Sequence, residues 1–211
     1  MKTYNVAVLG ATGAVGQQMI RVLEERDFPV KKLLPLASAR SAGKTITFRG
    51  EPVTVVEATD TAFEGMDIVL GAAQNPQAKQ FAPAIVKSGA VFVDNSSAFR
   101  MDPNVPLVVP EINPEDALKH HGIISNPNCS TIITLVALSG IRRVTPIEKM
   151  VACTYQAVSG AGVAGMGELE SQIKAHAEGS EMQIKTFPAQ ILSNVIRRSA
   201  PSWRTATPLR K

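Results

Sequence analysis

The feature that most constrains the fold is a glycine-rich segment that directly follows an apolar run near the N-terminus. Residues 4–9, YNVAVL, form a short, nearly continuous apolar run that is typical of a buried parallel strand. The segment Gly10-Ala-Thr-Gly13-Ala-Val-Gly16 follows, and it opens a stretch with apolar residues at helical spacing. Glycines at such a turn let the backbone approach a pyrophosphate, which then meets the positive end of the helix. The pattern predicts a dinucleotide-binding unit; a merely structural glycine turn is the alternative.

The rest of the first half alternates between strand-like and helix-like segments. Further strands are expected at 32–37, at 53–57 (a shorter one), at 66–73 and at 90–96, with a helix near 76–88. Such β-α-β alternation predicts an α/β fold with a doubly wound parallel sheet.

The second half has a different pattern. An apolar helix is expected after Cys129, with Ser130 or Thr131 near its start. A strand is expected at 148–158, followed by an amphipathic helix that ends at Gly179. We therefore divide the chain into a Rossmann-like domain (1–128), a second, incomplete α+β domain (129–196) and a basic tail (197–211).

The end of the second expected strand favours one dinucleotide over another. An NAD site would place Asp or Glu near residue 37 to bind the ribose 2′-hydroxyl. The sequence has Ala37-Ser-Ala-Arg40-Ser41 instead, with no carboxylate and with a guanidinium between hydroxyls. Arginine binds a 2′-phosphate through charged, bidentate hydrogen bonds, so NADP is the expected cofactor. The alternative is an exposed arginine in a polar loop.

Cys129 is the candidate nucleophile. It stands in SNPNCST, between a short apolar run at 122–125 and the apolar helix. A helix N-terminus stabilises a thiolate, and Asn126 and Asn128 have side-chain donors for a developing oxyanion. The alternative is a small core residue, which is also our interpretation of Cys153, in the middle of MVACTY.

A nicotinamide domain joined to a nucleophilic cysteine implies one class of reaction. The thiolate adds to an aldehyde, a hydride leaves for NADP, and a second nucleophile cleaves the thioester. Arg100 follows DNSSAF, just past an expected strand end, where open α/β sheets bind ligands. It is a candidate for binding a carboxylate or a phosphate, and a surface arginine is the alternative.

Composition and charge exclude several other classes. Hydrophobic residues make up 45% of the 211 residues and charged residues 19%, which fits neither a disordered chain nor a coiled coil. The net charge of +4 arises in the last fifteen residues, which hold five basic residues and no acidic one, so nucleic-acid binding is not expected. Two cysteines without a CxxC or Cys/His cluster indicate reduced thiols and no metal site. The sequence lacks a span-length apolar stretch and a secretory signal, so we expect a cytoplasmic protein with no membrane partner.

The motifs GATGAVG, ASARS, DNSSAFRMD, VPEINPEDA, NPNCST and TYQAVSGAG, in this order, resemble the bacterial type of the aspartate-semialdehyde dehydrogenase family. The resemblance extends from residue 1 to about residue 196. It implies reversible, NADPH-dependent conversion of L-aspartyl 4-phosphate to aspartate 4-semialdehyde and phosphate. That step leads to lysine, diaminopimelate, threonine and methionine. It also implies that residues 1–128 bind NADP, that residues 129–196 are part of a substrate and dimerisation domain, and that the protein is a homodimer.

The resemblance also implies roles for individual residues. In the cofactor site, Gly10, Thr12, Gly13, Ala14 and Val15 would surround the phosphates, Arg40 and Ser41 would hold the 2′-phosphate, and Ser159 and Gly160 would approach the nicotinamide. Arg100 would bind the acyl phosphate or phosphate beside Asn128, Cys129 would form the thioester, and Gln156 would orient the substrate. From the residues alone, Gln156 is only a polar residue at a strand end and the glycines after it only a flexible turn.

The sequence departs from the family after residues 194–196. The family continues with a substrate-binding arginine, an acid/base histidine and a phosphate-contacting lysine, whereas this sequence ends in RRSAPSWRTATPLRK. A truncation or a frameshift is the simplest account, and none of the three histidines, His120, His121 and His176, matches the catalytic position. Losing a positioned base costs about 10²–10⁴-fold in rate. We therefore expect residues 1–128 to fold, and the whole chain to be poorly active and prone to aggregate, with dimerisation in question. The alternatives are an inactive NADP-binding or dimerising module and, third, an unrelated reductase.

Overall fold

The computed structural model describes residues 2–196, which fall into two compact units. Among the described residues, the first unit comprises 2–154 and the second 155–196. The first contains the β-sheet and three of the α-helices, and the second contains one long helix and the segment that follows it. The basic tail predicted at 197–211 lies outside the described residues.

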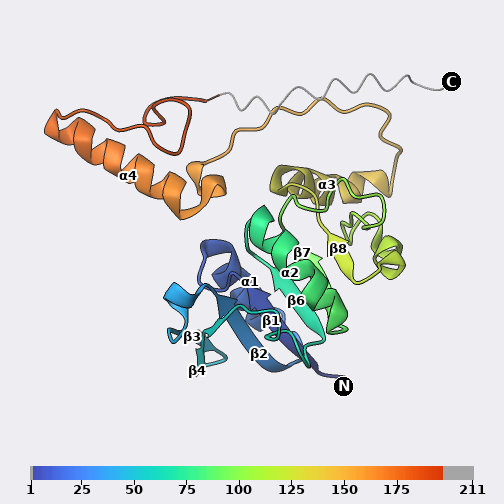
Figure 1. The fold of residues 1–211 in the computed structure, drawn as a ribbon. Coiled ribbons are helices and arrows are strands. Elements are labelled where there is room, and N and C mark those ends of the chain that lie inside the picture. Colours follow the sequence, from blue (N-terminus) through green and yellow to red (C-terminus); the bar gives the residue numbers. More distant parts are fainter. Residues whose placement is uncertain (1, 197–211) are drawn as a thin grey trace. The chain divides into compact units, whose positions relative to one another are not determined.

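The first unit is built on a six-stranded parallel sheet with the order β5-β2-β1-β6-β7-β8 (Figure 1). The chain adds β2 and β5 on one side of β1 and then β6, β7 and β8 on the other. The switch point, where α/β sheets bind ligands, therefore lies between β1 and β6. The strands are β1 (Tyr4–Leu9), β2 (Val30–Ala37), β5 (Val56–Glu57), β6 (Ile68–Gly71), β7 (Val91–Asp94) and β8 (Ile123–Ser125). The predicted doubly wound parallel sheet is confirmed.

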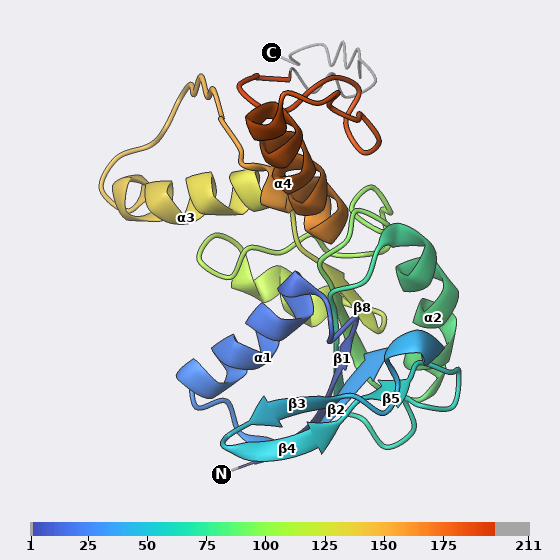
Figure 2. The same ribbon diagram turned by 90° about the vertical axis from the view of Figure 1, so that its left-hand side faces the viewer.

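Two helices cover opposite faces of this sheet (Figure 2). Helix α1 (Ala14–Glu25) packs Ile20 and Leu23 into a core cluster with Val6 and Val8 of β1. Helix α2 (Asn75–Lys87) packs into a second cluster that contains the intervening β1 residues, Ala7 and Leu9. Successive residues of a strand point to opposite faces of the sheet, so β1 contributes side chains to both clusters. Because both of its faces are buried, residues 4–9 are nearly all apolar.

The short strand predicted at 53–57 is wrong as one element. Strands β3 (Thr45–Phe48) and β4 (Glu51–Thr54) form an antiparallel hairpin, whereas β5 pairs in parallel with β2. Val55, between β4 and β5, continues the hairpin pairing: its N–H donates to the Lys44 carbonyl at 2.7 Å, and its carbonyl accepts from the Gly43 N–H at 2.9 Å. Residues 53–57 therefore belong to two strands, because the first part pairs with β3 and the last part pairs with β2.

The helix expected after Cys129 is confirmed, but the strand expected after it is wrong. Helix α3 (Cys129–Arg142) begins at the cysteine, whereas residues 146–157 form neither helix nor strand. Val151 is 84% exposed, and Cys153 is exposed as well, so the interpretation of Cys153 as a small core residue is wrong. A strand is stable only when a neighbouring strand pairs with its N–H and C=O groups, and no described residue of the first unit does so here.

The second unit is organised by helix α4 (Gly162–Glu178), which follows the short 3₁₀ helix η3 (Val158–Ala161). As predicted, α4 ends at Gly179, which adopts the left-handed conformation with φ of 67°. Two buried polar side chains of α4, Glu168 and Gln172, hold the following segment through its backbone. Helix and segment therefore form one small packed unit.

Two shorter helices complete the first unit: the 3₁₀ helices η1 (Ala39–Ser41) and η2 (Pro114–Lys119). In the portion that the structure describes, none of the helices combines the length and apolarity needed to cross a bilayer.

Candidate functional site

The glycine turn between β1 and α1 has the backbone shape that its sequence predicts. Gly10 has φ of +88°, and the Gly13 N–H closes the turn on the Gly10 carbonyl at 3.1 Å. A Cβ on Gly10 would lie 2.9 Å from the carbonyl carbon of Ala72, and one on Gly16 would lie 2.3 Å from the Gly10 oxygen. Side chains at these two positions are therefore excluded by backbone contacts.

The geometry of this turn fits a pyrophosphate. Gly13 is the N-cap of α1 and has no side chain to cap the first turn, which also holds no acidic residue. The N-terminus of α1 therefore offers N–H groups and a positive partial charge to an anion. Thr12 and Gly13 are half-buried, and Ala14 and Val15 are exposed, so all four border the surface at this point.

The proposed 2′-phosphate residues lie in η1, directly after β2. Arg40 is exposed, whereas Ser41 is buried and its N–H donates to the Ser38 carbonyl at 2.8 Å. The carboxyl end of β2 is bonded directly to the glycine turn, because the Leu36 carbonyl accepts from Gly10 and Ala11 at 2.8 and 3.0 Å. The cation and the turn thus follow neighbouring strands at one edge of the sheet.

Arg100 is fixed by two backbone carbonyls. Its Nε donates to the Asn126 oxygen at 2.8 Å and one Nη donates to the Asn95 oxygen at 2.9 Å. Asn95 follows β7 and Asn126 follows β8, so the guanidinium joins the loops at the carboxyl ends of two neighbouring strands. A guanidinium has five N–H donors, which leaves three beyond these two bonds.

The loop before Arg100 depends on a residue that the sequence analysis missed. Asp94 is fully buried at the end of β7, where its carboxylate accepts from the Ser96 N–H at 3.0 Å and from the Ser96 hydroxyl at 2.6 Å. The Ser96 hydroxyl in turn accepts from the Ala98 N–H at 3.1 Å. An Asp followed two residues later by Ser at a strand end is a signal for such a turn.

Cys129 is the first residue of α3, and its side chain is exposed. Ser130 and Thr131 lie in the first turn of this helix, as expected, and its N-cap is Asn128, whose Oδ1 accepts from the Ser130 N–H at 3.0 Å. The Cys129 thiol also donates to this oxygen, with Sγ and Oδ1 3.8 Å apart. The thiol thus lies at the positive end of a helix, where a thiolate is stabilised. The Asn128 oxygen acts as the cap, and its Nδ2 group is the donor that an oxyanion could accept from.

The remaining predicted residues belong to the second unit. Gln156 lies in the irregular segment before η3, and Ser159 and Gly160 lie in η3; all three are exposed. Their placement toward Cys129 stays a prediction.

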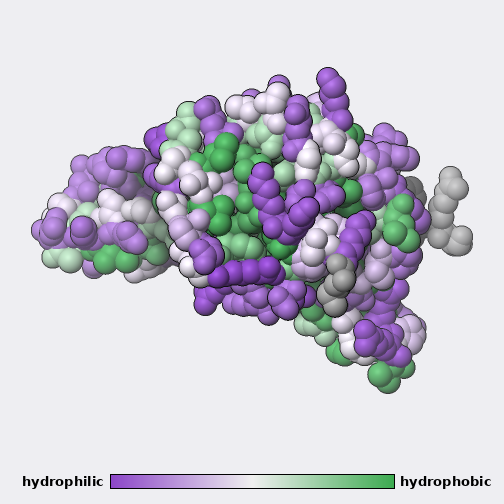
Figure 3. Space-filling view, turned by 90° about the horizontal axis from the view of Figure 1, so that it is seen from below, coloured by the Kyte–Doolittle hydropathy of each residue, from purple (hydrophilic) through white to green (hydrophobic). Residues whose placement is uncertain are grey.

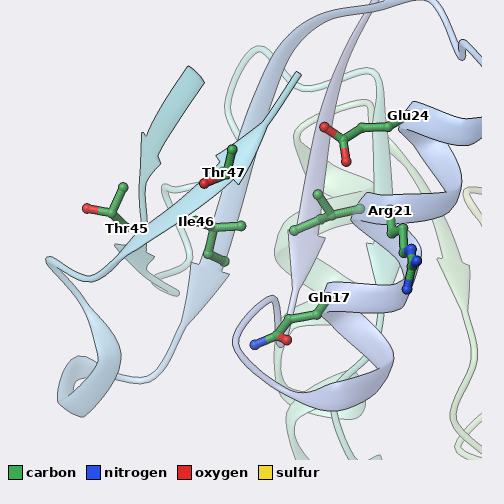
Figure 4. A pocket seen from close by; sticks show the side chains of 7 residues that line it. Gln17, Arg21, Glu24, Thr45, Ile46 and Thr47 are labelled. Atoms are coloured by element: carbon green, nitrogen blue, oxygen red, sulfur yellow. The ribbon is translucent and has the colours of Figure 1, made fainter. Parts of the chain in front are cut away.

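A hollow of about 460 Å³ lies elsewhere, between α1 and β3 (Figure 4). It contains none of the predicted site residues, and three of its polar side chains are bonded to other groups. Arg21 forms an ion pair with Glu25 at 3.1 Å, Glu24 accepts from the Arg49 N–H, and Gln17 donates to the Thr12 carbonyl at 3.3 Å. We therefore place the candidate site at the carboxyl edge of the sheet and not in this hollow.

A parallel sheet with a glycine turn at its switch point and a cysteine at a helix N-terminus defines a dinucleotide-binding α/β protein. The family model described as semialdehyde dehydrogenase, NAD binding domain, matches residues 5–120. The model described as semialdehyde dehydrogenase, dimerisation domain, matches residues 138–200. The chain belongs to the semialdehyde dehydrogenase family.

Individual relatives agree with this assignment. The chain is 51% identical over 197 residues to aspartate-semialdehyde dehydrogenase of Aquifex aeolicus, a match over 92% of this chain and 58% of that protein. Its fold resembles the crystal structure of aspartate semialdehyde dehydrogenase II complexed with ASA from Vibrio cholerae, with a TM-score of 0.87 and 44% identity over 92% of this chain and 58% of that one. The Candida albicans enzyme with NADP is more distant, with a TM-score of 0.54 and 25% identity over 69% and 48% of the two chains. This chain therefore spans 58% of the length of the first two relatives and 48% of that of the third.

Proposed function

We propose that the chain serves the reversible conversion of L-aspartyl 4-phosphate to aspartate 4-semialdehyde, with NADPH as reductant and Cys129 as nucleophile. The observation that supports this most is the arrangement of Cys129 and Arg100. The thiol lies at the start of α3, and Arg100 is bonded to Asn126, three residues before it. A nucleophile and a cation for the leaving phosphate thus occur on adjoining loops.

Each side chain has a defined role in the proposed step. The Cys129 thiolate attacks the acyl carbon, the carbon–oxygen bond to phosphate breaks, and a thioester forms on Sγ. Arg100 binds the departing phosphate through its remaining N–H donors, and the Nδ2 of Asn128 donates to the developing oxyanion. Bound NADPH supplies the hydride that converts the thioester to the aldehyde. Gln156 is proposed to orient the substrate, and Ser159 and Gly160 to contact the nicotinamide side of the cofactor site.

We propose NADP rather than NAD as the cofactor. Gly10, Thr12, Gly13, Ala14 and Val15 surround its pyrophosphate, and Arg40 with Ser41 binds the 2′-phosphate. The support is the exposed guanidinium after β2, at the edge of the sheet that holds the glycine turn. Removing a charged hydrogen bond costs about 1.5–3 kcal/mol, so Arg40→Ala should weaken NADPH binding about 10- to 150-fold and leave NADH binding unchanged.

We propose a homodimer and a cytoplasmic location, with substrates that are small molecules. The match of residues 138–200 to a dimerisation domain supports the first. The exposed apolar side chains of α3 also support it, since a partner would cover them. Residues 1–128 are proposed as the cofactor domain and 129–196 as part of the catalytic and dimerisation domain.

A second candidate is a catalytically inactive NADP-binding or dimerising module. One observation favours it. The sheet and the glycine turn of the cofactor site are formed, whereas the segment 146–157, which contains Gln156, forms neither helix nor strand. A chain with this function would bind NADPH and form no thioester.

The deciding experiment measures NADPH formation from aspartate semialdehyde, NADP and phosphate by absorbance at 340 nm. We expect slow phosphate-dependent turnover that falls below detection in Cys129→Ser, because removing a nucleophile typically costs at least about 10³-fold in rate. Cys153→Ser, which changes the other exposed thiol, is the matched control and should keep the activity. Turnover that survives Cys129→Ser would refute the mechanism, and NADPH binding without turnover would favour the second candidate.

A further inference from the structure

The N-terminus of α2 and the loop after β7 are joined by hydrogen bonds between Asn75 and Ser97. The Ser97 N–H donates to the Asn75 Oδ1 at 3.0 Å, and the Asn75 Nδ2 donates to the Ser97 hydroxyl oxygen at 2.8 Å. The two residues are 22 positions apart in the sequence, so this is a tertiary contact and not a local turn. Both are exposed, which means that the contact holds the loop without adding to the core.

This contact completes the anchoring of the loop that ends in Arg100. The start of the loop is fixed by Asp94, whose carboxylate binds Ser96. Its end is fixed by Arg100, whose guanidinium donates to two backbone carbonyls. Ser97 lies between these two points and is tied to Asn75, outside the loop. The Asn75–Ser97 contact therefore restrains the middle of the loop.

We propose that Asn75 is a positioning residue for the anion that Arg100 binds. By holding Ser97, it keeps the loop in the conformation in which the remaining guanidinium donors of Arg100 meet a phosphate group. A guanidinium binds phosphate in a fixed bidentate geometry, so a small rotation of the loop lowers its affinity. This inference rests on the proposed function, since it takes Arg100 as the phosphate-binding residue.

The test measures the Kd of inorganic phosphate for the full chain by isothermal titration calorimetry. Asn75→Ala removes all the hydrogen bonds between the two residues, so we expect its phosphate Kd to rise roughly 3- to 30-fold while its NADPH Kd stays within about twofold. Ser97→Ala keeps the bond from its N–H to the Asn75 Oδ1, so its phosphate Kd should rise less. The double variant should be no weaker than Asn75→Ala, because the Ser97 hydroxyl has already lost its partner in that variant. Ser97→Thr keeps the hydroxyl and should retain the affinity.

Gln74→Ala is the matched control, because Gln74 is the adjacent exposed carboxamide and forms no side-chain cap of α2. It should leave the phosphate Kd unchanged. If the phosphate Kd were unchanged in Asn75→Ala but raised in Arg100→Ala, the positioning role of Asn75 would be overturned and the proposed function would stand. A raised NADPH Kd with an unchanged phosphate Kd would also overturn it. If Arg100→Ala had no effect, or if the unmodified chain bound no phosphate, both the positioning role and the proposed role of Arg100 would be wrong.

Discussion

Gly16 shows at the scale of one residue why the turn after β1 needs glycine. It lies inside α1 with no unusual backbone angle, so local conformation does not require glycine there. The requirement comes from packing, because a Cβ would lie 2.7 Å from the Ala11 Cα as well as against the Gly10 carbonyl. The helix can therefore lie against the turn only when residue 16 lacks a side chain.

Replacing Gly16 with alanine should destabilise the first unit and weaken NADPH binding. The added methyl group meets backbone atoms that cannot move independently, and such overpacking typically costs about 1–3 kcal/mol. Thermal unfolding and NADPH fluorescence titration measure the two effects. Gly140→Ala is the control. Gly140 lies in α3, and a Cβ added there would meet no other atom, so this variant should raise the free energy of unfolding by up to about 1 kcal/mol. Equal effects of the two variants would contradict the packing argument.

At the scale of elements, the start of α3 joins a structural cap to a candidate nucleophile. Asn128 satisfies the Ser130 N–H and accepts from the Cys129 thiol. The same oxygen therefore fixes the first turn of the helix and restrains the sulfur.

Removing this cap should destabilise α3. We expect Asn128→Ala to lower the free energy of unfolding by about 0.5–2 kcal/mol, as the loss of an N-cap does. Asn128→Asp keeps an accepting oxygen and should retain most of that stability in urea denaturation. Asn104→Ala, in an exposed loop, controls for loss of a surface amide. Equal stability of Asn128→Ala and the unmodified chain would show that the cap contributes nothing.

Helix α4 holds the following segment through Glu168 and Gln172. The Glu168 carboxylate accepts from the N–H groups of Lys185, at 3.1 Å, and Thr186. The Gln172 Oε1 accepts from Ile191 and Leu192, each at 3.0 Å. Burial raises the pKa of Glu168, but hydrogen bonds from Thr186 and Lys185 outweigh it, so the pKa lies below its ordinary value.

The attachment of this segment should therefore weaken in acid. A carboxyl group with a lowered pKa in the folded state stabilises that state above its unfolded pKa, and this stability is lost as the pH falls through the folded value. We expect faster amide hydrogen exchange at Lys185 and Thr186, beyond the intrinsic pH effect, as the pH falls through that range. In Glu168→Gln this extra pH dependence should disappear, whereas Glu170→Gln, on an exposed side of α4, should keep it. Identical pH profiles in all three proteins would exclude Glu168 as the titrating group.

At the scale of the whole molecule, α3 is an apolar helix without a buried residue. Ile133 is 70% exposed and Ile141 is 51% exposed. Hydrophobic side chains also reach the surface between hydrophilic ones on the face seen in Figure 3. Exposed apolar side chains on one helix favour association, because burying each one removes it from water.

We expect the chain to self-associate through α3, and Ile133→Glu to weaken that association at least about tenfold. Burying an isoleucine contributes about 1.5–3 kcal/mol, and a buried unpaired charge adds a penalty. Sedimentation velocity over a range of concentrations measures the association. Leu118→Glu changes an 86% exposed apolar residue outside the helix and should have little effect. A monomer at all concentrations, or equal effects of both variants, would contradict this role of α3.

Much of the fold and part of the candidate site could be predicted from local sequence. The glycine turn, β1, α1 and the start of α3 at Cys129 depend on neighbouring residues in the chain, and each is where the pattern predicts it. The strand at 148–158 was wrong because strand formation depends on a partner, which the residue pattern of the segment itself does not contain. The run at 53–57 divided for a related reason, since its two parts pair with different strands.

The sequence by itself determined the order of elements, the two faces of β1 and the chemical identity of the candidate nucleophile and cations. These follow from periodicity, glycine spacing and residue type, all of which are local. The tertiary structure alone decided that Asp94 and Asn75 support the loop of Arg100 and that Arg100 bonds to the loop after β8. Those contacts join residues from separate strands and helices, and they exist only once the parallel sheet has brought the ends of its strands to one edge.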